Sequence, residues 1–126
     1  MAKRMSGLSS YGQIREHDIA SATSPTELMK MLFDKACVLL KTAMQAVEAD
    51  DDQAFHQAAL HALQIVLSLR FVLDTDSGSE LSESLFATYT TIAASLKKAN
   101  QEKDVESIAT IYAALDELRT AWHSVA

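Results

Sequence analysis

Histidine is the most chemically versatile residue type in this chain, and two of its four histidines, His56 and His61, lie close together. Two neutral imidazoles can bind one zinc ion when they project from the same face of a helix. His56 and His61 are five residues apart, which separates them by about 140° around a helix axis. They therefore face different directions, and no metal site is predicted from this pair.

The run Asp74-x-Asp76-x-Gly78 is a second candidate for metal binding, because it has the alternating acidic residues of a calcium loop. Such a loop needs glycine at its sixth position and glutamate at its twelfth. Here the glycine is at the fifth position and Leu85 occupies the twelfth. There is also no glycine-rich phosphate loop and no usable Ser/His/Asp spacing. We predict no metal, no cofactor, no catalytic residue and no enzymatic activity.

His61 alone suggests phosphoryl transfer, since an exposed histidine on a helix can accept a phosphoryl group. Histidine phosphotransfer domains are small acidic four-helix bundles, and His61 falls among the polar residues of its segment. These domains place a lysine three residues after the histidine, whereas this chain has Gln64 there. A solvated surface histidine is the simpler interpretation. A histidine phosphotransfer-like signalling bundle using His61 is kept as the alternative function.

The charge and hydropathy of the chain restrict its partners. A net charge of −6 at pH 7 disfavours binding to nucleic acid phosphates and to anionic membranes. The longest apolar region, residues 63–73, is broken by polar residues and is too short to span a bilayer, and no apolar run follows the basic N-terminus. The only cysteine, Cys37, is expected to be a buried small hydrophobe. We expect a cytoplasmic protein (bacterial cytosol) with no nucleic acid partner and no membrane insertion.

The residues around the only proline, Pro25, mark the start of the folded region. Ser24 can cap the first backbone N–H groups of a helix, and Glu27 completes a capping box. Proline is favoured at the first helical position. Residues 1–23 are mostly polar and small, and we interpret them as a flexible N-terminal arm with room for a short helix.

Residues 24–126 are predicted to form one all-α domain, an antiparallel four-helix bundle. Three glycines, one proline and 48% hydrophobic residues are typical of a helical protein with few turns. Apolar residues recur every three or four positions in four segments, approximately 24–49, 52–74, 80–100 and 104–124. Short loops between helices of this length predict antiparallel neighbours.

The same periodicity predicts which side chains form the core. In the second segment these are Phe55, Ala58, Ala62, Val66, Leu69 and Leu73. In the third segment they are Leu81, Leu85, Thr88, Ile92, Leu96 and Ala99. In the fourth segment they are Val105, Ile108, Tyr112, Leu115, Leu118 and Trp122.

Two further groups of residues provide more apolar surface than a four-helix core needs. In or beside the polar stripe of the second segment lies a seam of large apolar residues, Leu60, Leu63, Leu67 and Phe71. The third segment has a face of small residues away from its core, Ala87, Thr91 and Ala94. We interpret the seam and the small face together as a docking groove for a partner helix. Burial through tilted packing or through a homodimer is the alternative.

Several motifs in order along the chain resemble those of FliS-type flagellin export chaperones. The start of that family's first long helix resembles Ser24-Pro25 followed by Leu28-Met29-Lys30-Met31-Leu32-Phe33-Asp34. The end of its second helix resembles Leu69-Arg70-Phe71-Val72-Leu73-Asp74. Its closing pattern resembles Leu118-Arg119-Thr120-Ala121-Trp122, and its N-terminal tyrosine matches Tyr11. The resemblance covers nearly the whole chain.

This resemblance implies a non-enzymatic cytoplasmic chaperone that binds the disordered C-terminal segment of flagellin. Such a chaperone prevents premature polymerisation and presents flagellin to the flagellar type III export gate. We expect the groove to receive flagellin, while Leu8 and Tyr11 of the arm contact flagellin or occupy the empty groove. Packing of Tyr11 against the end of the bundle is the alternative for that residue. An additional role, sequestering another flagellar regulator, stays open.

Overall fold

The computed structural model describes residues 24–73 and 79–125, which form four α-helices and no strand within these ranges. The helices are α3 (Pro25–Glu48), α4 (Asp52–Val72), α5 (Glu80–Glu102) and α6 (Val105–His123). The all-α four-helix prediction is therefore confirmed, with helix ends within two residues of those expected. The predicted arm, with Leu8 and Tyr11, and the run from Asp74 to Gly78 lie outside the described residues.

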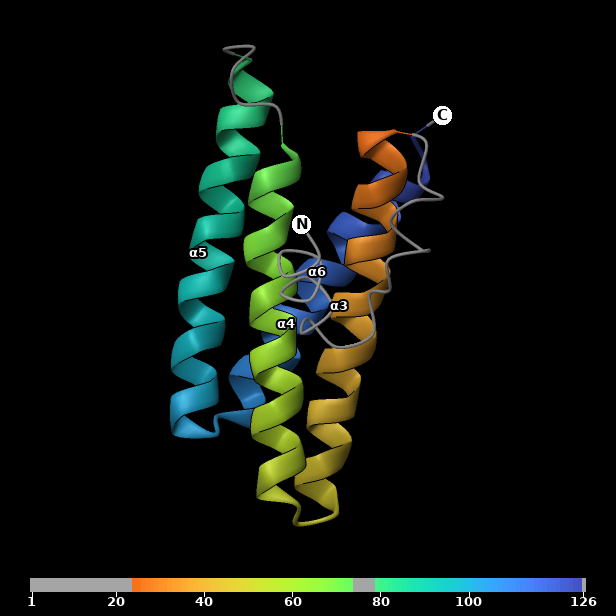
Figure 1. The fold of residues 1–126 in the computed structure, drawn as a ribbon. Helices are drawn as coiled ribbons and strands as arrows, with labels where there is room; N and C mark the ends of the chain where they lie inside the picture. The colour runs from red at the N-terminus through yellow and green to blue at the C-terminus, as the bar shows by residue number, and fades with distance from the viewer. Residues whose placement is uncertain (1–23, 74–78, 126) are drawn as a thin grey trace, which may run out of the picture.

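The four helices run antiparallel in chain order, as Figure 1 shows. α4 packs between α3 and α5, and α6 closes the bundle by contacting α3 and α5. The contact of α6 with α3 is more extensive than its contact with α5. In Figure 1, α6 crosses behind the other helices from the end of α5 toward the beginning of α3. The first turns of α5 are therefore left with α4 as their main neighbour.

Local sequence determines where each helix begins. Pro25 is the first residue of α3, and the Ser24 hydroxyl accepts a 3.1 Å hydrogen bond from the Glu27 N–H. The carboxylate of Asp51 and the hydroxyl of Ser79 cap α4 and α5 in the same way. Asp104 caps α6 and also accepts a 2.7 Å hydrogen bond from the Ser107 hydroxyl. Each cap pairs a backbone donor that a helix leaves without an internal partner.

The two tight turns use left-handed residues. Asp50, between α3 and α4, has φ 57°, and Lys103, between α5 and α6, has φ 52°. In each turn the next N–H bonds back to a carbonyl five residues earlier, Asp51 to Ala46 at 2.8 Å and Asp104 to Ala99 at 2.9 Å. These bonds pair carbonyls at the helix C-terminus and reverse the chain within a few residues.

The core is centred on α3, which contributes Phe33 and other fully buried residues to all its neighbours. The ring of Tyr89 is fully buried edge-on against Phe33, with ring centroids 5.8 Å apart. The Tyr89 hydroxyl accepts a 3.1 Å hydrogen bond from the indole N–H of Trp122. Burial raises the pKa of the Tyr89 phenol, an effect that the Trp122 bond partly offsets. This contact fixes α5, α3 and α6 relative to one another.

The predicted core of α4 is confirmed, because all six of its residues are buried. The prediction for α5 was wrong at Leu81, which is 68% exposed, and at Thr88, which is exposed. Tyr89 and Ala93 are buried instead. The oblique course of α6 explains the exposure of Leu81, because it leaves the first turns of α5 uncovered.

The α6 prediction was right at its centre and incomplete at its ends. Ile108 and Leu115 are fully buried, and Ile111 is buried where Tyr112 was expected. Tyr112 is half-buried, with the Lys41 ammonium 5.6 Å from its ring centroid. The other predicted positions, Val105, Leu118 and Trp122, are half-buried.

Candidate functional site: apolar hollows flanking α5

The α4 seam, defined as Leu60, Leu63, Leu67 and Phe71, lies along one side of α4 with unequal exposure. Phe71 is 88% exposed and Leu60 is 45% exposed, although both are large apolar side chains. Leu63 and Leu67 are half-buried and pack against the core. The seam is therefore anchored at its middle by core contacts and open to solvent at its two ends.

A hollow between α4 and α5, called here the α4/α5 hollow, adjoins the exposed end of this seam. Its volume is about 460 Å³, and its lining residues are Leu67, Arg70, Phe71 and Phe86. The guanidinium carbon of Arg70 lies 4.6 Å from the centroid of the Phe86 ring. The hollow thus combines three apolar walls with one cation, a composition suited to an apolar side chain of a partner.

A second hollow, the α5/α6 hollow, lies between α5 and α6 and also has a volume of about 460 Å³. It is lined by Ala87, Thr88, Thr91, Ile92, Ala114, Glu117 and Leu118. Most of these side chains are small, so the two helix backbones leave space between them that larger side chains would fill. The small face predicted from the sequence contributes Ala87 and Thr91 to this hollow.

The structure therefore divides the predicted groove residues between two places. Phe86 and Ala87 are consecutive and about 100° apart on α5, so they line hollows on opposite flanks of that helix. Ala94 is exposed and lines neither hollow, and neither do Leu60 and Leu63. Flagellin binding at any of these residues stays a prediction.

Two residues of the α4/α5 hollow were missed by the sequence prediction. Arg70 is the only charged residue within the apolar run 63–73, and that isolation was an available signal. Phe86 gave no periodic signal, because it is on the border between the core and the exposed face of α5.

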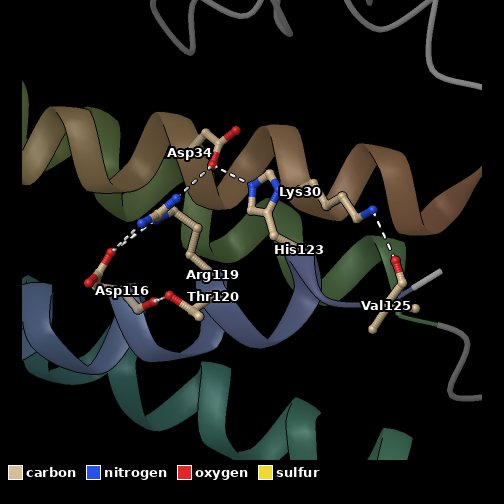
Figure 2. Close-up of polar contacts among 7 residues, drawn as sticks. All are labelled: Lys30, Asp34, Asp116, Arg119, Thr120, His123 and Val125. Carbon is tan, nitrogen blue, oxygen red and sulfur yellow. Dashed lines mark hydrogen bonds and ion pairs between the residues drawn. The ribbon is translucent and has the colours of Figure 1, made fainter.

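A third region, between α3 and α6, is polar, and Figure 2 shows its contacts. One oxygen of Asp34 lies 2.8 Å from Nε2 of His123 and 3.7 Å from the Arg119 guanidinium. Arg119 also donates to Asp116 at 2.8 and 3.0 Å. The Lys30 ammonium donates to the carbonyl of Val125 at 3.2 Å. These contacts connect the end of α6 to the first half of α3.

The same region contains Cys37 in the wall of a cleft of about 350 Å³. Cys37 is 6% exposed, which confirms the prediction of a buried small hydrophobe. Burial, followed by the nearby Asp116 carboxylate, raises the pKa of its thiol from 9.0 to about 11. A thiol is nucleophilic only when ionised, so Cys37 is poorly suited to covalent chemistry at neutral pH.

The histidines on α4 are not gathered into a site. His56 Nδ1 lies 2.7 Å from the side-chain oxygen of Asn100 on α5, and His61 is half-exposed on α4. Within the described ranges, no group of three His, Cys, Asp or Glu side chains is arranged to hold a metal ion. None of the described helices is long and apolar enough to cross a membrane.

Comparison with known proteins gives a consistent result. Residues 7–126 match the family described as flagellar protein FliS. The flagellar secretion chaperone FliS of Salmonella typhimurium is 29% identical over 95% of this chain and 90% of its own length. The protein of the same description from Bacillus subtilis is 30% identical over 89% of this chain and 82% of its own length. The corresponding Escherichia coli protein is 28% identical over 92% and 86%, respectively.

Proposed function

We propose, from the fact that this chain belongs to the FliS family of flagellar secretion chaperones, that it binds the disordered C-terminal segment of flagellin. By covering that segment in the bacterial cytosol, it prevents premature polymerisation and presents flagellin to the flagellar type III export gate. This function requires no enzymatic step and no cofactor. It requires an exposed apolar surface that binds the flagellin segment and later releases it.

The observation that carries the proposal is the exposure of the α4 seam beside the α4/α5 hollow. Phe71 is 88% exposed on the last turn of α4, next to a hollow that Leu67 and Phe86 also line. Covering a side chain of this kind stabilises a complex by about 1.5–3 kcal/mol. Disordered amphipathic segments supply such cover by folding as they bind, with apolar anchors at helical spacing.

The remaining predicted contacts belong to the same proposal. The seam (Leu60, Leu63, Leu67 and Phe71) receives one part of the flagellin segment, and the small face (Ala87, Thr91 and Ala94) receives another. Leu8 and Tyr11 of the N-terminal arm contact flagellin or cover the groove in the free protein. Another flagellar regulator can compete for this surface.

The test is calorimetric titration of the C-terminal segment of flagellin into the full chain and its variants. Phe71→Ser removes an exposed apolar anchor without opening the core, and we expect it to weaken binding about ten-fold or more. Val38→Ser is the matched control, because Val38 is 54% exposed on α3, in the cleft between α3 and α6. Equal affinities of the parent chain and both variants for the flagellin segment would show that the α4 seam is not part of the binding site.

Deleting residues 1–18 tests the arm in the same titration. If Leu8 and Tyr11 contact flagellin, the truncated chain binds more weakly. If they cover the groove in the free protein, it binds more tightly. An unchanged affinity would show that the arm takes no part in flagellin binding.

A further inference from the structure

Among the described residues, Arg70 is the only charged one that lines the α4/α5 hollow. It lies on the last turn of α4, between the buried Leu69 and the exposed Phe71. Its guanidinium is stacked over the Phe86 ring at 4.6 Å, a distance at which the ring face attracts a cation. This stacking holds the planar group at the wall of the hollow.

The guanidinium has no hydrogen-bond acceptor among residues 24–73 and 79–125. Its Nε–H is shielded from solvent and donates to none of them. The other arginine in the described part of the chain, Arg119, differs sharply, because it pairs with both Asp34 and Asp116. The Arg70 Nε–H, buried beside an apolar wall and without an acceptor among the described residues, is costly unless a partner supplies one.

Two structural roles explain part of this placement. A cation in the last turn of a helix is stabilised by the helix dipole, and the aliphatic part of Arg70 covers apolar surface. A lysine would serve both roles equally well. Neither role requires the planar fork of an arginine, the group that recognises a carboxylate through two parallel hydrogen bonds, over the Phe86 ring.

We propose that Arg70 binds the side-chain carboxylate of an aspartate or glutamate in the segment that occupies the α4/α5 hollow. This inference rests on the proposed function and specifies the partner's chemistry. The bound segment places an apolar side chain between Leu67, Phe71 and Phe86, and a carboxylate one helical turn away that reaches Arg70. The ion pair between Arg70 and this carboxylate fixes the register of the bound segment along the α4 seam.

The charge of the chain makes this contact selective. With a net charge of −6, the protein as a whole repels an acidic partner group. A carboxylate is therefore favoured at Arg70 and disfavoured over most of the surface. The seam continues from Phe71 to Leu60, roughly 16 Å along the helix, and Arg70 adjoins its Phe71 end.

The experiment is a double-mutant cycle measured by calorimetry. The probe is the C-terminal segment of flagellin, together with versions in which each aspartate or glutamate is changed singly to its amide and one version with an amidated C-terminus. Each is titrated into the parent chain, Arg70→Gln and Arg70→Lys. The control is Lys41→Gln, which removes an equal charge from a cation stacked on Tyr112 at the α3/α6 face.

Arg70→Gln is expected to weaken binding of the unmodified segment about ten-fold, and Lys41→Gln to leave it unchanged. Arg70→Lys keeps the positive charge but loses the planar guanidinium, so its affinity for the unmodified segment is expected to lie between those of Arg70→Gln and Lys41→Gln. One side-chain amide version of the segment binds the parent chain about ten-fold more weakly and shows no further loss with Arg70→Gln. Thermal unfolding of each variant establishes that it is folded. If Arg70→Gln is not folded, Arg70→Lys replaces it in the double-mutant cycle.

Unchanged affinity in both Arg70 variants, while the parent chain binds the segment, would overturn this inference and leave the proposed function intact. Losses that add independently for every side-chain amide version would overturn it too. If the amidated C-terminus alone removes the effect of Arg70, the carboxylate is the chain end and our assignment is wrong. Absence of binding by the parent chain would overturn the proposed function as well.

Discussion

The Cys37 thiol is expected to reduce the stability of the folded protein at high pH. Burial and the nearby Asp116 carboxylate raise its pKa from 9.0 to about 11 in the folded chain. In the unfolded chain the thiol ionises at its ordinary pKa, so the unfolded state binds fewer protons between these two values. The stability contributed by the protonated thiol is complete below pH 9 and is lost as the pH rises toward 11.

The size of the effect follows from these values. At a pH one unit above the unfolded pKa and one unit below the folded pKa, the free energy of unfolding falls by about 1 kcal/mol. Cys37 is 6% exposed, so solvent does little to screen the contribution. A loss of this size is measurable by chemical denaturation.

The assay is urea unfolding followed by circular dichroism, near pH 7 and about three units higher, under reducing conditions. Cys37→Ala is the comparison, because it removes the thiol and keeps a small apolar side chain in the core. The parent chain should lose about 1 kcal/mol more than Cys37→Ala between the two conditions. Burial also raises the pKa of the Tyr89 phenol, but this contribution is common to both proteins and cancels. Equal losses in the two proteins would refute the argument.

Two further predictions concern a turn and a histidine. Asp50→Gly should stabilise the fold by about 0.5–1 kcal/mol. Glycine adopts the left-handed conformation at φ 57° without strain, and the substitution removes a negative charge from the end of α3. An unchanged urea midpoint would contradict this prediction. His61→Gln should leave flagellin binding unchanged, and incubation of the parent chain with acetyl phosphate should give no phosphohistidine, whereas phosphorylation at His61 would favour the phosphotransfer alternative.

The fold was predictable from the sequence because its signals are local. The cap at Ser24 with Pro25, the aspartates before α4 and the cap at Ser79 each specify a helix start without reference to distant residues. The polar residues of α4 also recur at helical spacing, so the six core residues named for it could be assigned from periodicity. Family resemblance then extended the interpretation to function, and the match over residues 7–126 confirms the FliS family.

The core errors in α5 and the division of the predicted groove residues between two hollows have one physical origin. Which flank of α5 faces α4 depends on the crossing direction of α6, and that direction is a property of tertiary packing. Sequence periodicity therefore misplaced Leu81 and Thr88 in the core. It also joined Ala87 to the α4 seam, whereas Phe86 is the α5 residue that adjoins Leu67 and Phe71.

The oblique course of α6 has a consequence for how the molecule opens. Beyond Leu115, no side chain of α6 is fully buried, and its last turns are held by the Trp122 indole bond and by polar contacts to Asp34. Backbone amides in these turns should exchange with deuterium well before those near Ile108. Fraying of this end exposes one side of Tyr89 while α3 and α4 stay paired, so it is a sub-global opening that leaves the remaining helical hairpin intact.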